Sequence, residues 1–163
     1  MSLLKAEGVF GFKHYRNGKC ICDKVVRNAI TNEGKDYLLN SVFHYENIIG
    51  IWYIGLISTL NYTGVAATDT YLSHSGWEEF ESYVGNRVQW AENEPANAII
   101  DGDEETFTIN SDTNDLKGFF LASYEGKSFS GSEHILWNTA TTEVVVADED
   151  IFRVTYTLQL LNC

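Results

Sequence analysis

Apolar and polar residues alternate along much of the chain, and this period of two is typical of β-strands with one buried and one solvated face. Shorter alternating or apolar stretches lie at 87–91, 106–110, 118–122, 135–137 and 143–146. Many short strands separated by turns predict a mostly-β, antiparallel β-sandwich, either immunoglobulin-like or jelly-roll-like. The clearest alternation is in the last strand, where every second residue is apolar: Phe152, Val154, Tyr156, Leu158 and Leu160.

Residues 8–27 predict an N-terminal β-hairpin. Two strand-like stretches flank Asn17 and Gly18. An Asn-Gly pair tolerates the positive φ angles of a type I′ turn, which suits the twist of paired strands. Because this hairpin opens the chain, residues 1–27 are interpreted as a hairpin or arm that reaches a neighbouring protein.

Residues 32–43 predict one short helix. Thr31 or Asn32 can cap its first free N–H groups. Glu33 and Asp36 carry negative charge near its N-terminus, where the helix dipole favours it. We expect the apolar stripe that follows at helical spacing to pack onto a sheet. That stripe consists of Leu38, Leu39, Val42 and Phe43.

The segment 51–57 is almost entirely apolar, which predicts a central strand buried on both faces. A long irregular region, 58–86, follows it. Loops of this length inside a compact domain usually carry function or contacts. The rings of Trp77 and Phe80 are expected to anchor this loop.

The chain has 163 residues, of which 44% are hydrophobic, and this fits a single domain over 1–163. A domain of this length buries about 70% of its unfolded surface and needs no disulfide or metal to fold. Cys20 and Cys22 are two positions apart, a spacing that lacks disulfide geometry on a strand. A C-x-C pair alone is also a poor zinc site. Reduced thiols are therefore expected, with no metal and no cofactor.

The formal net charge of −12 is unevenly distributed. Residues 1–27 hold six basic residues against Glu7 and Asp23, whereas the rest of the chain is strongly acidic. An acidic body repels phosphate backbones, which argues against a nucleic-acid partner. The basic segment is predicted to dock on an acidic protein partner. Its candidate binding residues are Lys5, Lys13, Arg16, Lys19, Lys24 and Arg27.

Hydropathy argues against a membrane partner. The apolar run at the N-terminus is too short for a signal peptide. The most apolar stretch, 48–57, contains two glycines and reaches only about half the length of a membrane span. We therefore expect a soluble protein that is made in a cytoplasm.

No motif indicates a catalytic residue, and we expect the protein not to be an enzyme. No histidine is paired at helical spacing with another metal ligand. His74 lies between two serines but has no nucleophile elbow and no evident orienting acid. The acidic runs 101–105 and 148–150 fit ordinary turns. A calcium site or a glycosidase carboxylate pair is the less favoured alternative for them.

The tryptophans offer a different kind of chemistry, because indole rings stack on sugars in carbohydrate-binding modules. Trp52 and Trp137 lie inside apolar strands and are expected in the core. Trp77 and Trp90 are the candidates for surface aromatic contacts.

Short segments distributed over most of the chain resemble those of a known protein family. The most specific are the strand 55–57 and the segment 73–79, which reads Ser-His-Ser-Gly-Trp-Glu-Glu. The chain resembles a widespread set of small virion-associated proteins of tailed bacteriophages and prophages. It lacks the glycine-rich loop expected at 139–143. The matching positions are 8–10, 17–18, 28–39, 52–57, 67–70, 73–79, 83, 86–87, 107–109, 118–121 and 154–158.

The resemblance implies a structural component of the virion and supplies no catalytic residue. The first expectation is a capsid decoration or cement protein bound to the major capsid protein. The alternative is a tail component, such as a fibre, an adaptor or a tube-associated subunit. Either one implies other virion proteins as partners and a homo-oligomeric arrangement in the particle. A carbohydrate-binding module for host recognition is a third and less favoured reading.

Overall fold

The computed structural model describes residues 4–162 as mostly β-structure with one short helix, as the sequence pattern predicts. The helix α1 (Asn32–Phe43) follows the third strand. The strands are β1 (Leu4–Arg16), β2 (Lys19–Arg27), β3 (Ala29–Ile30), β4 (Trp52–Ser58), β5 (Val88–Trp90), β6 (Ile99–Ile100), β7 (Glu105–Thr108), β8 (Leu116–Ala122), β9 (Leu136–Val144) and β10 (Ile151–Asn162).

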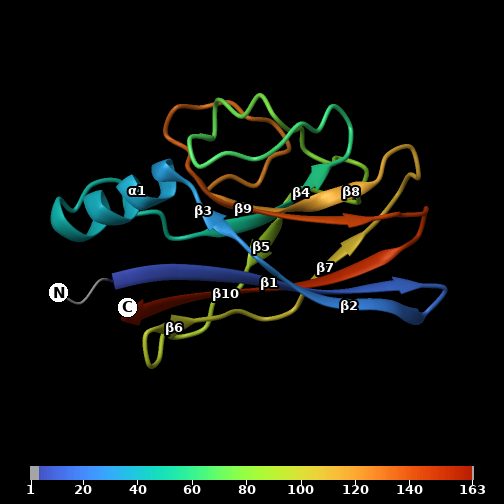
Figure 1. The fold of residues 1–163 in the computed structure, drawn as a ribbon, viewed down its shortest axis with the longest axis horizontal. Coiled ribbons are helices and arrows are strands. Elements are labelled where there is room, and N and C mark those ends of the chain that lie inside the picture. The colour runs from blue at the N-terminus through green and yellow to red at the C-terminus, as the bar shows by residue number, and fades with distance from the viewer. Residues whose placement is uncertain (1–3, 163) are drawn as a thin grey trace.

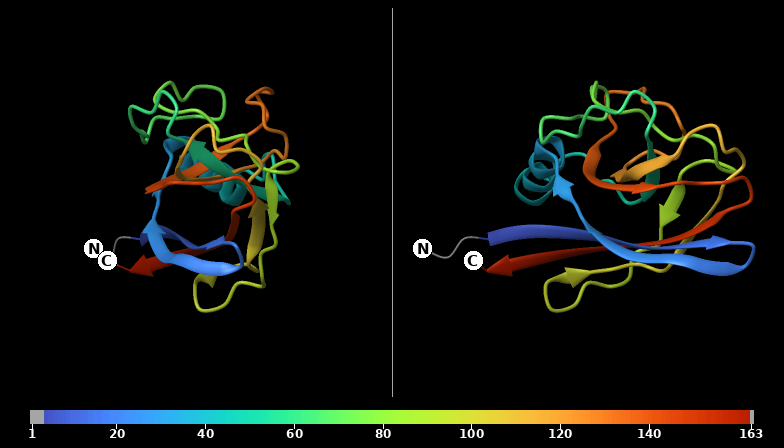
Figure 2. Two further views of the ribbon diagram at one scale, coloured as in Figure 1. Left: turned by 90° about the vertical axis from the view of Figure 1, so that its right-hand side faces the viewer. Right: turned by 45° about the vertical axis from the view of Figure 1, so that its right-hand side comes forward.

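The strands form two antiparallel sheets. The first has the order β2-β1-β10-β6, with β7 also paired to β10. The second has the order β3-β9-β8-β4-β5. Figures 1 and 2 show the two sheets as two layers, with the segment from β2 to β3 passing from one to the other. The region 58–86 covers the outer side of the second sheet (Figure 1).

The predicted N-terminal hairpin is confirmed. Asn17 and Gly18 have φ angles of 50° and 75°, which place both residues in the left-handed region that the turn requires. However, β1 lies between β2 and β10 and pairs with β10 over twelve residues. The hairpin is therefore part of the first sheet, with β1 inside the sheet and β2 at its edge, so its described residues do not form a separate arm.

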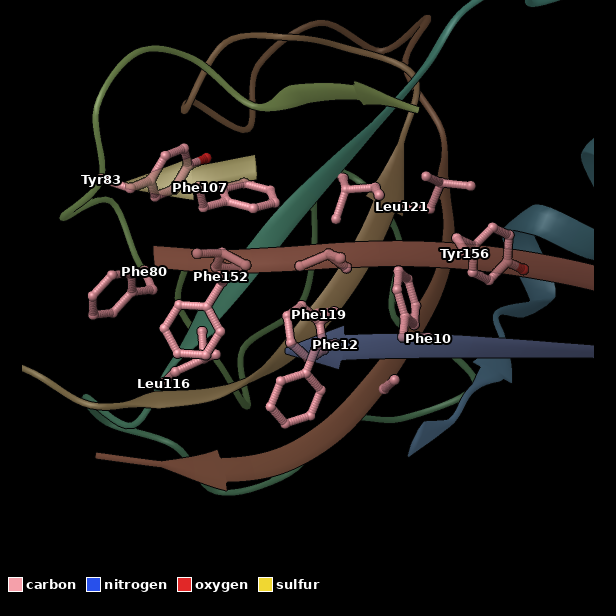
Figure 3. Close-up of a cluster of buried hydrophobic side chains, with 14 of the residues drawn as sticks. Phe10, Phe12, Phe80, Tyr83, Phe107, Leu116, Phe119, Leu121, Phe152 and Tyr156 are labelled. Atoms are coloured by element: carbon pink, nitrogen blue, oxygen red, sulfur yellow. The ribbon is translucent and has the colours of Figure 1, made fainter. Parts of the chain in front are cut away.

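Aromatic side chains from both sheets meet in one core (Figure 3). The ring centroid of Phe119 on β8 lies 5.6 Å from that of Phe10 and 5.1 Å from that of Phe12, both on β1. Phe152 and Tyr156 of β10 are fully buried in the same cluster. The alternation in the last strand thus places one of its faces in the core, as predicted.

The apolar run 51–57 predicts a central strand, and β4 is an interior strand of the second sheet, between β8 at the centre and β5 at the edge. Its residues from Ile54 to Ser58 are all buried. Gly55 pairs with Phe120 across the sheet, and the Phe120 ring lies over the glycine so closely that a Cβ atom there would overlap it. The absence of a side chain at Gly55 therefore makes room for a core aromatic.

The stretches 135–137 and 143–146, predicted as two strands, belong mainly to one strand, β9. The polar residues between them lie on β9 opposite β8, and Asn138 and Thr139 are buried. The two-residue strands β3 and β6 were not predicted, because two residues carry no measurable alternation.

The helix α1 has the predicted bounds, and Thr31 is its cap, since its Oγ1 accepts a hydrogen bond of 2.9 Å from the Gly34 N–H. The expectation that its apolar stripe packs onto a sheet is wrong for Leu39, Val42 and Phe43, which are exposed. The helix contacts the sheet instead through its first turns. A Cβ at Gly34 would lie 2.5 Å from the carbonyl oxygen of Trp137.

Substitution of Gly55 tests how tightly the second sheet is packed. We expect Gly55→Ala to lower the free energy of unfolding by about 1–3 kcal/mol, because the methyl group displaces the Phe120 ring. Chemical denaturation measures this change. Gly50→Ala is the matched control, since a Cβ there meets no atom within 4 Å. Equal stability of the two variants would contradict the packing argument.

Candidate functional site

The segment 73–79, which is the most specific part of the family resemblance, forms packing and hydrogen bonds within the chain. The His74 ring stacks on Trp77 at a centroid distance of 4.0 Å, and its Nδ1 lies 3.1 Å from the Trp77 carbonyl oxygen. The Trp77 indole donates a hydrogen bond of 2.9 Å to Asp69. Burial lowers the pKa of His74, which favours its neutral form. Every one of these contacts holds the loop together.

Glu79 and Arg87 form a buried ion pair at the base of the same loop. The Arg87 Nη2 lies 2.7 Å from the Glu79 Oε2, and the two side chains are 0% and 2% exposed. Arg87 also donates to the Tyr124 carbonyl oxygen, and its guanidinium lies over the Phe129 ring at 4.5 Å. The hydroxyl of Tyr83 donates to Glu79, and burial raises the pKa of Tyr83. The loop is thus fastened to the second sheet by one fully bonded arginine.

Removal of the Arg87 charge tests this attachment. We expect Arg87→Met to lower the free energy of unfolding by about 3–5 kcal/mol, because it leaves the Glu79 carboxylate buried without its partner. Lys117→Met is the control, since it breaks the more exposed Lys117–Glu143 pair and should cost less than about 1 kcal/mol. Urea denaturation of both variants measures the difference. Similar losses in the two would contradict a structural role for the buried pair.

Asp150 is a second buried charged group, at the entry of β10. Its side chain is 1% exposed. Its Oδ2 lies 2.7 Å from the His14 Nε2, and it accepts two hydrogen bonds from Arg16, at 2.7 and 2.9 Å. Burial alone would raise the pKa of Asp150, but the hydrogen bonds from Arg16 and His14 outweigh it and hold that pKa below its ordinary value. One member of the acidic run 148–150 is therefore used to join the last strand to the first.

The pH dependence of stability tests the role of Asp150. Its pKa is lower in the folded protein than the ordinary value of 3.8, so its stabilisation is complete above that value and is lost as the pH falls below it. We expect Asp150→Asn to be less stable than the wild type by about 3 kcal/mol at pH 7, and we expect this difference to shrink between pH 4 and pH 2.

Denaturation with urea at a series of pH values measures this difference. Asp148→Asn is the control, because Asp148 is exposed in the same acidic run. A difference between wild type and Asp150→Asn that is independent of pH would argue against an ionised Asp150.

The acidic residues do not converge on a metal site. Among residues 4–162, no group of three or more histidine, cysteine, aspartate or glutamate side chains is placed to hold a metal ion. In the run 101–105, Glu104 lies 3.2 Å from the Lys13 Nζ and 3.4 Å from an Arg153 nitrogen. Glu105 accepts a hydrogen bond from the Ala91 N–H. Glu104 and Glu105 are thus engaged with neighbours in the chain.

The six basic residues proposed for partner binding lie on β1 and β2, and four of them form ion pairs within the chain. Lys5 and Arg27 both contact Glu7, at 2.6 and 3.3 Å. Lys13 and Arg16 contact acidic residues elsewhere in the chain, Glu104 and Asp150 respectively. Lys19 and Lys24 lie on the exposed strand β2. Contact of these six residues with a partner stays a prediction.

The two tryptophans expected at the surface are buried, so the prediction of surface aromatic contacts is wrong. Trp77 is 2% exposed and packs in a second core cluster under the loop 58–86. Trp90 is 4% exposed and lies edge-on to Tyr156, with ring centroids 5.1 Å apart. The expectation that the Trp77 ring anchors its loop is confirmed.

A groove of about 680 Å³ is lined by the beginning of β1, residues 27–30, α1 and Leu160 near the end of β10. We call it the terminal groove. Its apolar lining includes Leu4 and Leu160, which are 71% and 38% exposed, together with Leu38 and Leu39 of α1. Figure 1 shows that α1 lies at the same end of the molecule as the start of β1 and the end of β10. Its charged lining residues are Lys5, Glu7, Arg27 and Lys35.

Exposed apolar side chains continue from this groove along α1 and the segment after it. We call this set the helix-end face. A soluble monomer rarely exposes several large apolar residues in one region, and such regions mark contact surfaces. The sequence pattern identified the apolar stripe of α1 but not that it faces solvent. The helix-end face consists of Leu39 (55% exposed), Val42 (58%), Phe43 (73%), Tyr45 (83%) and Ile48 (67%).

Comparison with protein-family models, curated proteins and solved structures found no match to this chain. Within the part of the chain that the structure describes, no helix has the length and hydrophobicity needed to cross a membrane.

Proposed function

We propose that this chain is a structural component of a tailed-phage particle, bound to a neighbouring virion protein through the terminal groove and the helix-end face. The observation that carries the proposal is the apolar surface at one end of the molecule, where Phe43 and Tyr45 are 73% and 83% exposed. Burial of such surface against a partner stabilises the complex by about 25 cal/mol for each Å² of apolar area removed from water. The resemblance to virion-associated proteins supplies the kind of partner.

The charges around the groove support a partner that is apolar and acidic. Lys5, Arg27 and Lys35 line the groove together with one acidic residue, Glu7, so the groove has an excess of positive charge in a molecule whose net charge is −12. Two copies of so acidic a chain repel each other over long distances. A different protein that presents carboxylates beside apolar side chains is therefore the better complement. The proposed homo-oligomeric arrangement then comes from the symmetry of the particle surface, because each copy of this protein makes the same contact with its own virion partner.

We favour a capsid decoration or cement protein that binds the major capsid protein. Repetition over a capsid lets a modest interface hold many subunits, which suits a small domain with one apolar end. A tail component, such as a fibre, an adaptor or a tube-associated subunit, is the second candidate, because it uses the same kind of contact. The two differ in copy number per particle.

We also propose that the two sheets form an antiparallel β-sandwich. The support is the common core, in which Phe10 and Phe12 of one sheet contact Phe119 of the other. Two sheets with interdigitating inner faces are the arrangement of that architecture. An immunoglobulin-like or jelly-roll-like order of strands stays a prediction.

A role in binding without catalysis is part of the proposal. The Glu79–Arg87 pair and the Asp150 cluster are used for internal attachment, which leaves them no free group for chemistry. A carbohydrate-binding module is disfavoured, because Trp77 and Trp90 are only 2% and 4% exposed.

Purified particles of the phage or prophage that encodes the chain provide the test. We expect quantitative mass spectrometry to find the protein in these particles, with hundreds of copies for a capsid protein or about a dozen for a tail component. We expect Leu39→Asp with Phe43→Asp to lower occupancy at least about tenfold, because two carboxylates would be buried against the partner.

Val84→Asp with Val145→Asp is the matched control. Both valines are exposed, at 62% and 67%, and lie outside the groove and the helix-end face, so this variant adds the same charge elsewhere. It should occupy particles as the wild type does. A protein that is missing from purified particles would refute the proposal. Equal occupancy of the two double variants would refute the assigned surface.

A further inference from the structure

The terminal groove contains an open edge of the first sheet. The strand β1 pairs with β10 from Leu4 to Tyr15, but it pairs with β2 only from Val9 to Arg16. Within the part of the chain that the structure describes, residues 4–8 therefore have a neighbouring strand on one side only. All of these residues line the groove. An open strand edge offers unpaired N–H and C=O groups and is a template for another strand.

Asn28 marks the point at which this edge opens. Its N–H donates a hydrogen bond of 3.0 Å to the Gly8 carbonyl oxygen, and its side-chain amide donates one of 3.3 Å to the Tyr156 hydroxyl. The next two residues form β3, which pairs with β9 in the second sheet (Figure 1). The chain thus leaves β1 at Asn28 and crosses to the other sheet, and no other segment among residues 4–162 takes its place beside residues 4–7.

The free hydrogen-bonding groups of this edge belong to Leu4 and Ala6. In an antiparallel sheet, successive residues of a strand direct their N–H and C=O groups to opposite sides. Gly8 accepts a hydrogen bond from Asn28, so its backbone groups point away from β10. The groups of Ala6 and Leu4 point the same way, because each lies two residues before the next in this alternation. An added strand could bond to both residues.

The surroundings of the edge indicate the sequence of such a strand. Ala6 packs against the main core, and Leu38 of α1 lines the groove. A residue opposite Ala6 on an added strand shares its face of the sheet, so we expect it to be apolar. On the other face, Lys5 and Arg27 share one carboxylate, that of Glu7. The excess of positive charge favours carboxylates at the alternate positions of the added strand.

We propose that the terminal groove binds an extended, acidic segment of a neighbouring virion protein, which adds to the first sheet as a strand antiparallel to residues 4–8. The inference rests on the proposed function, because the particle role supplies the partner, and it specifies how that partner is held. The strand pairs of the first sheet are all antiparallel, so an added strand would continue the existing pattern. In contacts of this kind, main-chain hydrogen bonds give affinity and alternating side chains give specificity.

A capped peptide, Ser-Val-Glu-Val-Glu-Val-Ser, is the probe for this mode of binding. We expect calorimetric titration of the intact protein to show that it binds at least about tenfold more tightly than Ser-Val-Lys-Val-Lys-Val-Ser, because the groove has an excess of positive charge.

Methylation of the peptide nitrogens separates strand pairing from other kinds of docking. When the valines lie opposite Leu4 and Ala6, the N–H groups of the valines point toward β1 and those of the glutamates point away. N-methylation of the valines should therefore weaken binding at least about tenfold, whereas N-methylation of the glutamates should change it less than about twofold.

Substitutions on the protein test the same contact. Ala6→Pro removes an N–H that faces the groove and leaves the hydrogen bonds to β10, so it should weaken binding of the glutamate peptide at least about tenfold. Arg27→Glu with Lys35→Glu should abolish the preference for the glutamate peptide over the lysine peptide. Lys19→Glu with Lys24→Glu is the matched control, because both lysines lie on β2 outside the groove, and it should keep that preference.

Failure of the glutamate peptide to bind, or equal binding of the two N-methylated peptides, would overturn the proposal. Unchanged binding by folded Ala6→Pro would do the same, and if this variant does not fold, the N-methylated peptides decide the question alone. A dimer of the free protein in analytical ultracentrifugation that Ala6→Pro dissociates would assign the edge to a second copy instead. In purified particles, wild-type occupancy by Ala6→Pro would refute the strand addition alone, whereas peptide binding by a protein that is missing from particles would refute the particle role alone.

Discussion

The pairing of β1 with β10 is the interaction on which the rest of the structure depends. It joins the two ends of the described chain over twelve residue pairs. The inward residues of these two strands, among them Phe12 and Phe152, supply much of the core beneath the second sheet. Asp150 reinforces the pairing from the side, because it holds His14 and Arg16 at the entry of β10. The first sheet therefore cannot be complete until the last strand has been made, and such long-range pairing is typical of slow-folding β-proteins.

This arrangement separates the proposed binding surface from the parts that hold the fold. The hairpin carries most of the basic residues of the N-terminal segment, but β1 lies inside the sheet, and Lys13 and Arg16 form ion pairs with acidic residues elsewhere in the chain. Deletion of 1–27 would remove an interior strand, so its effect on docking could not be distinguished from unfolding. The helix-end face lies outside this framework, since α1 contacts the sheet mainly through Gly34 and its first turns.

The sequence predicts the structural elements that are determined by residues close together in the chain. Thr31 caps the helix within its own first turn, and the Asn17–Gly18 pair forms its turn without help from distant residues. The alternation of β10 is strong enough to identify the buried face. The failures concern long-range packing. The stripe of α1 looks like a core stripe, but only Leu38 packs against the core, and the position of the sheets leaves Leu39, Val42 and Phe43 exposed.

The candidate functional residues also depend on long-range packing that the sequence does not show. Arg16 and Lys13 appear free in the sequence, because their partners Asp150 and Glu104 lie far along the chain. Trp90 was expected at the surface because it does not lie inside an apolar strand, yet its ring is buried and packs edge-on to Tyr156. The terminal groove has no signature in residue spacing, because it arises where segments that are distant in sequence meet.

The adjacency of the two strand ends has a practical consequence for protein engineering. Leu4 and the end of β10 border the terminal groove, at the same end as α1 (Figure 1). An affinity tag or reporter fused at either end would emerge beside that groove and hinder access to it. The Asn17–Gly18 turn lies at the opposite end of the first sheet (Figure 1), so a peptide grafted there would be displayed away from the groove.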